Sequence, residues 1–84
     1  MDMIARTSKQ LGAAIRRHRK QAGLSQGELG TRIGLRQATV SKLEAGEPGV
    51  RLQTILDALT ALDLELVVRP RSKVTTATLE DILS

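Results

Sequence analysis

Residues 34–47, GLRQATVSKLEAGE, carry side chains suited to hydrogen-bonded recognition. If this segment is a helix, with about 100° between residues, Val40 and Leu43 face the interior. The opposite face then presents Gln37, Ala38, Ser41, Lys42 and Ala45. That face is small and polar and carries one cation, so it is shaped to meet a polar surface at close range.

Groups for catalysis or metal binding are sparse. His18 is the one histidine, cysteine is absent, and His18 has no Ser, Cys or acid partner at a recognisable spacing. No glycine-rich phosphate loop with its lysine occurs. We therefore expect neither an enzyme nor a metal or cofactor site. The absence of Phe, Tyr and Trp also disfavours single-strand or RNA binding by base stacking.

Composition and charge indicate one small, mostly α-helical domain. The chain has 84 residues, and its core must be Leu, Ile, Val and Ala. No apolar run approaches the roughly 20 residues that span a bilayer, and MDMIAR lacks a signal-peptide core, so a cytoplasmic protein is expected. Residues 1–45 hold nine Lys/Arg against three acids, whereas residues 46–84 hold four against six. The basic half is suited to a polyanion, or is simply a solvated surface.

Capping-box patterns predict the start of two helices. TSKQ places the N-cap of the first helix at Thr7, with Gln10 three residues on, and Gly23 follows its end. Its predicted inward stripe is Leu11, Ala14, Ile15 and Ala22, and its outward basic residues are Arg16, Arg17, Arg19 and Lys20. SQGE starts the second helix, with Ser25 as N-cap and Glu28 as its reciprocal capping-box partner.

Glycine and leucine spacing outline the remaining helices. Gly27 and Gly30 each cost a helix about 1 kcal/mol relative to Ala, so they either permit close packing or are tolerated. Gly34 allows a sharp turn into a third helix over about 36–45. A fourth helix is predicted over about 51–62, with an inward stripe of Leu52, Ile55, Leu56, Leu59 and Leu62.

The period then changes to that of a strand. LELVVRP, residues 64–70, approximates alternation and is stopped by Pro70. A lone strand leaves its backbone groups unpaired, so pairing with a second copy across a two-fold axis is expected. The dimer-strand residues are Leu64, Leu66, Val67 and Val68. Pairing with the N-terminal DMIA or a helical continuation are the alternatives. The tail, residues 71–84, is expected to be flexible.

Two short helices joined by a tight glycine turn, beside two others, match a helix-turn-helix. In that arrangement the second helix of the pair enters the major groove of DNA. Gln37 can then bind adenine and Lys42 can donate to guanine. Gln26, at the start of the preceding helix, is placed to hold a phosphate near the positive helix end. Residues 1–63 are therefore predicted to form a DNA-binding domain.

Residues 11–62 resemble the XRE/Cro/C1-type helix-turn-helix family, through Arg19 and GLSQGELGTRIGLRQATVSKLEAGE at 23–47. The resemblance implies an all-α, lambda-repressor-like four-helix domain, and a structural ion pair between Arg19 and Glu44. It implies base reading by Gln37, Ala38 and Lys42, with Thr39 and Ser41 as helpers, and a phosphate contact from Gln26. Ser25 and Arg36 are expected to contact phosphates as well. Gly30 departs from the family pattern, which usually has Ala there, and AGEPGV departs from its usual helix exit.

A closer similarity is to HipB-like antitoxins, carried by SKQLGAAIRRHRKQAG, RQATVSKLE and LTALDLELVV. In that group the strand forms an intersubunit lid, and the partner is a HipA-type Ser/Thr kinase toxin. This implies a cytoplasmic, nucleoid-associated homodimer on a palindromic operator, repressing its own operon, with no membrane role. A stand-alone XRE-family or phage-type regulator and a protein-binding module are the alternatives. Candidate partner surfaces are the acids Asp57, Asp63, Glu80 and Asp81.

Overall fold

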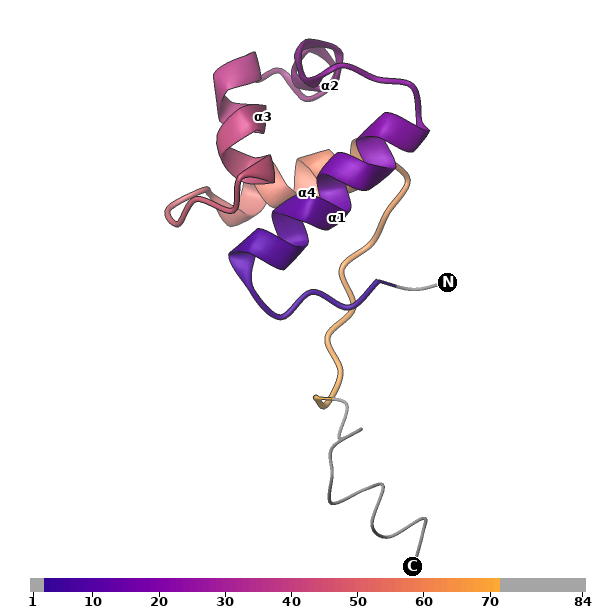
Figure 1. The fold of residues 1–84 in the computed structure, drawn as a ribbon, viewed down its shortest axis with the longest axis vertical. Helices are drawn as coiled ribbons and strands as arrows, with labels where there is room; N and C mark the ends of the chain where they lie inside the picture. Colours follow the sequence, from indigo (N-terminus) through magenta and orange to yellow (C-terminus); the bar gives the residue numbers. More distant parts are fainter. Residues whose placement is uncertain (1–2, 72–84) are drawn as a thin grey trace, which may run out of the picture.

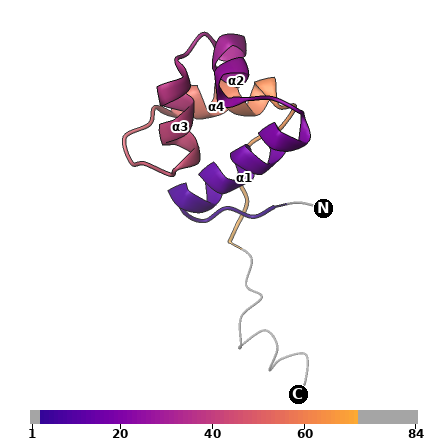
Figure 2. The same ribbon diagram turned by 45° about the horizontal axis from the view of Figure 1, so that its top comes forward.

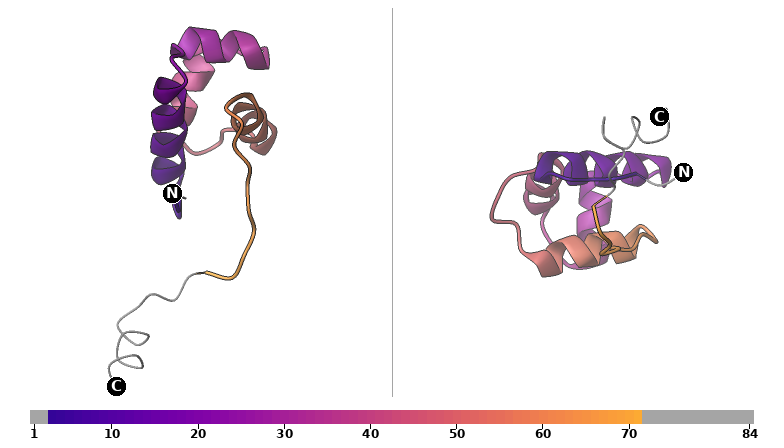
Figure 3. Two further views of the ribbon diagram at one scale, coloured as in Figure 1. Left: turned by 90° about the vertical axis from the view of Figure 1, so that its right-hand side faces the viewer. Right: turned by 90° about the horizontal axis from the view of Figure 1, so that it is seen from below.

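Four helices make up the part of the chain that the computed structural model describes, residues 3–71. They are α1 (Ser8–Gln21), α2 (Gln26–Ile33), α3 (Gln37–Glu44) and α4 (Leu52–Ala61). In Figure 1, α1 crosses the front, α4 lies behind it, and α2 and α3 lie above and beside it. The view from below in Figure 3 shows α1 and α4 on opposite sides of the helical body. The four predicted helices are confirmed, each within about two residues.

Local hydrogen bonds explain where the first two helices begin. Thr7 caps α1, and its Oγ1 accepts from the Gln10 backbone N–H at 3.1 Å. The Gln10 amide oxygen, however, accepts from the N–H of Arg6 at 2.6 Å, so the reciprocal half of the predicted box is displaced by one residue. In α2 the predicted box is complete, because Ser25 and Glu28 exchange two bonds of 3.0 Å.

The core lies where all four helices meet. Its buried apolar residues are Ile15, Leu29, Val40, Leu43, Ala58 and Leu59. Leu52, predicted to face inward, is 62 % exposed. The small side chains Thr54 and Ala58 lie at the centre of the buried face of α4 instead. Small residues let a helix approach its neighbours closely, so the buried stripe of α4 is rotated toward them and Leu52 falls outside it.

Two glycines mark close backbone contacts. A Cβ added to Gly12 would lie 2.5 Å from the carbonyl oxygens of Leu43 and Glu44, so α1 packs directly on the end of α3. A Cβ on Gly30 would lie 2.6 Å from the Leu35 carbonyl oxygen, across the turn between α2 and α3. At Gly27 the nearest atom would be 3.8 Å away. Close packing therefore explains Gly30, whereas Gly27 is only tolerated.

Beyond α4 the chain leaves the helical body (Figure 1). Leu64 still packs against the core, and its N–H donates to the Leu59 carbonyl at 2.7 Å. Residues 64–71 have no regular secondary structure, and within residues 3–71 no ladder joins them to the N-terminal segment. Leu66, Val67 and Val68 are exposed. Pairing between two copies stays a prediction, and the predicted tail lies outside the described residues except for Arg71.

Candidate nucleic-acid interface

The outer side of α3 is an uncovered surface with the predicted composition. Val40, Leu43 and Glu44 are buried, whereas Gln37, Ala38, Ser41 and Lys42 are exposed and Thr39 is half-buried. Figures 1 and 2 show α3 at the edge of the molecule, with its outer side turned away from the other helices. The predicted base-reading residues thus share one accessible helix face.

The turn before α3 fixes how that helix leaves α2. Gly34 ends α2 in the left-handed region at φ 69°, and the Leu35 N–H donates to the Gly30 carbonyl at 2.8 Å. Arg36 then occupies the N-cap of α3 with an exposed side chain and no side-chain cap bond. Arg36 therefore lies at the start of α3, where the helix dipole also favours an anion.

A buried ion pair locks the end of α3 to α1. Arg19 Nε and Nη2 donate to the Glu44 carboxylate at 2.6 and 3.0 Å, and Nη1 donates to the Leu24 carbonyl at 2.7 Å. Hydrogen bonding to Glu44 raises the pKa of Arg19 above its ordinary value. The ion pair implied by the family resemblance is confirmed. The prediction that Arg19 points outward is wrong, because a fully hydrogen-bonded partner makes its burial possible.

The same carboxylate holds the start of α2. The Gln26 Nε2 donates to Glu44 Oε1 at 3.1 Å, which leaves its second amide hydrogen available to a ligand. The Ser25 hydroxyl accepts from the Glu28 N–H at 3.0 Å. Two of the three predicted phosphate-contacting residues, Ser25 and Gln26, thus lie at the start of α2, beside α3.

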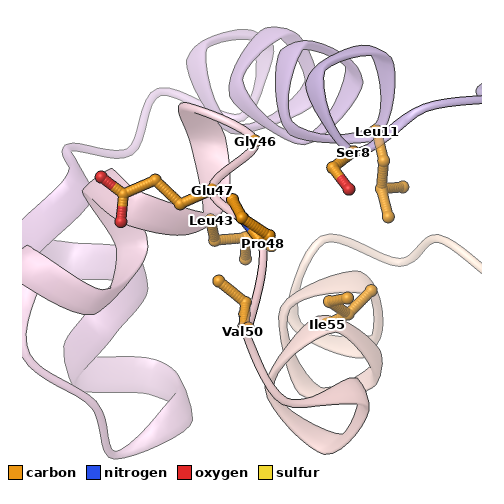
Figure 4. A pocket seen from close by; sticks show the side chains of 9 residues that line it. Ser8, Leu11, Leu43, Gly46, Glu47, Pro48, Val50 and Ile55 are labelled. Atoms are coloured by element: carbon orange, nitrogen blue, oxygen red, sulfur yellow. The ribbon is translucent and has the colours of Figure 1, made fainter.

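Two hollows adjoin α3. One, of about 420 Å³, lies between α3 and the start of α4 and is lined by Leu35, Thr39, Lys42, Glu47, Pro48, Gly49, Val50, Arg51 and Thr54. The other, of about 80 Å³, lies between α1, α3 and α4, with Leu11, Leu43 and Ile55 in its wall (Figure 4). The second hollow is far below the size of a usual ligand pocket. The first is open and bears the cations of Lys42 and Arg51 beside α3.

Within residues 3–71, no group of three His, Cys, Asp or Glu side chains could hold a metal ion. His18 is half-buried on α1, and Asp57 accepts a bond from Gln53 at 2.8 Å on α4. No helix in the same range is long and apolar enough to cross a membrane.

Sequence reasoning missed two residues that position the interface. Gly12 allows α1 to contact α3, and Gly46, just after α3, contacts α1. A Cβ on Gly46 would lie 2.5 Å from Lys9 Cα, and its φ is +75°. The available signal was a glycine within the apolar stripe of the first helix, where Ala would favour the helix more.

Comparison with known sequences places the chain in a family. A profile described as "Helix-turn-helix domain" matches residues 10–72. The chain is 37% identical over 70 residues to the uncharacterized HTH-type transcriptional regulator y4dL of Sinorhizobium fredii, covering 81% of this chain and 35% of that protein. It thus spans about a third of y4dL. It is 36% identical over 59 residues to antitoxin HipB of Escherichia coli K12, covering 70% of this chain and 67% of HipB.

Solved structures agree with the sequence matches. A HipB variant in complex with an O2 20mer superimposes with a TM-score of 0.79 at 29% identity, over 86% of this chain and all of that one. HipB in a HipA-HipB-O2-O3 complex gives 0.75 at 30% identity, with the same coverage. The restriction-modification controller protein C.AhdI of Aeromonas hydrophila gives 0.63 at 38% identity, over 69% and 84%. The chain therefore belongs to the XRE-type helix-turn-helix family of DNA-binding transcriptional regulators and is related to the HipB antitoxins.

Proposed function

We propose that the chain is a sequence-specific transcriptional repressor that also acts as the antitoxin of a HipA-like kinase and represses its own operon. The observation that carries the DNA-binding part is the exposed face of α3, held in place by the buried Arg19–Glu44 pair. The antitoxin part is supported by the likeness to HipB, whose solved chains are matched over their full length, including one in complex with HipA.

In this proposal α3 enters the major groove. The Gln37 amide pairs with adenine, Lys42 donates to guanine, and the Ala38 methyl meets a thymine methyl. Thr39 and Ser41 assist from the same face. Ser25, Gln26 and Arg36 hold phosphates, the first two from the positive end of α2 and the third from the N-cap of α3.

Two copies of the chain make the operator-binding unit. Leu66, Val67 and Val68 are exposed apolar residues in an extended segment, and Leu64 anchors that segment to the core. Pairing of residues 64–70 with the same segment of a second copy would bury these side chains and satisfy both edges. The dimer would then read two half-sites about one helical turn apart, roughly 34 Å.

Substitution of Gln37 tests base reading. Gln37→Ala should weaken binding to the DNA upstream of the chain's own gene by roughly 1–3 kcal/mol, because a bidentate base contact is lost. Binding to a random duplex of equal length should change little. Fluorescence anisotropy with labelled duplexes measures both, and Gln21→Ala, an exposed amide at the end of α1, is the matched control. Equal losses on both duplexes would exclude Gln37 from base reading.

The second candidate is a regulator without a toxin. The likenesses to y4dL, a transcriptional regulator, and to C.AhdI, a restriction-modification controller protein, favour it. A tagged pull-down from native cells at moderate salt, with mass spectrometry, separates the two. A stoichiometric kinase-like protein encoded beside this gene supports the antitoxin. Recovery of only DNA and further copies of this chain supports the stand-alone regulator.

A further inference from the structure

α1 carries an exposed basic surface that none of the roles above uses. Lys9, Arg16, Arg17 and Lys20 are all exposed, and the helix contains no Asp or Glu. Within residues 3–71 the salt bridge joins Arg19 to Glu44. None of these four cations therefore forms a salt bridge within that range. A carboxylate on the same helix would neutralise such a surface, and here it is missing.

The contacts of α1 fix which way these cations face. Gly12 and Arg19 lie on the line of contact with α3. At 3.6 residues per turn, Ile15 lies roughly 60° to one side of Gly12, in the core. Lys9, Arg16 and Lys20 lie about 40–80° to the other side. Because the core occupies the first side, these three cations lie on the side that continues into the exposed face of α3.

Arg17 faces a different direction from Arg16. It lies about 140° from Gly12, away from α3. Ala13, small and exposed, lies about 100° from Gly12, next to the other three cations. We define Lys9, Arg16 and Lys20 as the α1 stripe, which extends about 16 Å along the helix at 1.5 Å per residue.

The spacing of the two helices suits the edge of a DNA groove. Packed helices lie about 8–10 Å apart, and Gly12 lets the backbone of α1 contact the last turn of α3 directly. The major groove is about 12 Å wide. A helix beside one that lies in the groove therefore overlies the sugar-phosphate backbone at the groove edge, within reach of long Lys and Arg side chains.

We propose, resting on the proposed DNA-binding function, that the α1 stripe binds the phosphate backbone flanking the groove occupied by α3. It supplies affinity that does not depend on base sequence, while α3 supplies the choice of sequence. The contact surface thus extends beyond the helix-turn-helix unit to a third helix, whose positive charge is opposite to that of the DNA backbone.

The full-length chain with Arg16→Gln and Lys20→Gln tests this. Gln has nearly the helix propensity of Arg and Lys, so α1 should persist. Affinity should fall by the same factor, roughly tenfold or more at 0.1 M salt, for the upstream duplex and for a random duplex. The slope of log K against log salt concentration should fall by about 1.8 for two lost phosphate contacts. Arg16→Lys with Lys20→Arg should restore both quantities.

The matched control removes the same two charges elsewhere. Arg17 and Arg32 are exposed, and Arg32 lies near the end of α2. Arg17→Gln with Arg32→Gln should leave the slope nearly unchanged. Equal slopes for the two double variants would overturn the α1 stripe, even if Gln37→Ala still loses specificity. If the wild-type chain binds the upstream duplex no more tightly than the random one, the proposed function fails. The salt slopes on random DNA still show whether the α1 stripe contacts phosphates.

Discussion

Glu44 connects three segments of the interface through one buried carboxylate. It accepts bonds from Arg19 on α1 and from Gln26 on α2, and it lies in the last turn of α3. A carboxylate in such a setting is costly unless each of its oxygens is hydrogen-bonded, and here both are. The direction in which Gln37 and Lys42 point therefore depends on Glu44. The helical pattern alone placed Arg19 outward, because its partner lies 25 residues away and only the family resemblance linked the two.

Gly46 permits a second contact on which the position of α3 depends. Gly46→Ala should destabilise the fold by about 3 kcal/mol, for two reasons. The alanine must adopt positive φ, and its Cβ must displace the Lys9 backbone, 2.5 Å away. Gly49→Ala is the matched control, since Gly49 has φ +89° but nothing within 4 Å. It should cost about 1 kcal/mol. Urea unfolding measures both, and equal losses would mean that the Lys9 contact contributes nothing.

Helix ends were predicted well because their signals are local. The Ser25–Glu28 box, the N-cap at Thr7 and the left-handed Gly34 each depend on residues within four positions of one another. The buried face of α4 was predicted less well. Leucine periodicity correctly predicted Ile55, Leu56, Leu59 and Leu62, which are buried or pack against the core. It also included Leu52, which is exposed, and missed the buried Thr54 and Ala58. Which stripe of a helix packs depends on the shape of its neighbours, and a single segment does not contain that information.

The α2 cap predicts a dependence of stability on acid. Bonds from the Ser25 backbone and hydroxyl lower the pKa of Glu28 from its ordinary 4.5. Because the folded pKa is lowered, the stabilisation is present above the unfolded pKa and is lost as pH falls through the folded value. Glu28→Gln keeps the cap bonds without the charge. Its free energy of unfolding should therefore vary less with pH below about 4.5 than that of the wild type. Urea unfolding at several pH values measures this, with the exposed Glu47→Gln as control. Parallel curves for wild type and Glu28→Gln would contradict the prediction.

Within residues 3–71, the exposed apolar residues Leu66, Val67 and Val68 lie on the segment that follows α4 (Figure 1). The α1 stripe lies on a different element. The alternation of residues 64–70 predicted a strand from sequence, yet the described chain has no regular structure there. The physical reason is that a strand requires a partner, and the expected partner belongs to a second copy. The predicted strand therefore depends on an assembly of two copies, whereas the predicted helices depend on one chain.

Substitution of an apolar residue in the expected strand tests that assembly. Leu66, 53 % exposed in the single chain, would be covered in the dimer. Leu66→Asp should raise the dimer dissociation constant at least about tenfold, because a carboxylate would be buried without a partner. Leu52→Asp is the matched control, since Leu52 is 62 % exposed on α4 and lies outside residues 64–70. Light scattering over a concentration series measures both dissociation constants.

Loss of the dimer should also weaken operator binding. Two linked copies make the second half-site contact intramolecular, and a monomer loses that gain. Leu66→Asp should therefore bind a two-half-site duplex much more weakly than wild type, while binding to a single half-site stays equal. If Leu66→Asp remains as dimeric as Leu52→Asp, residues 64–70 do not hold the two copies together, and the exposed apolar residues after α4 require another partner.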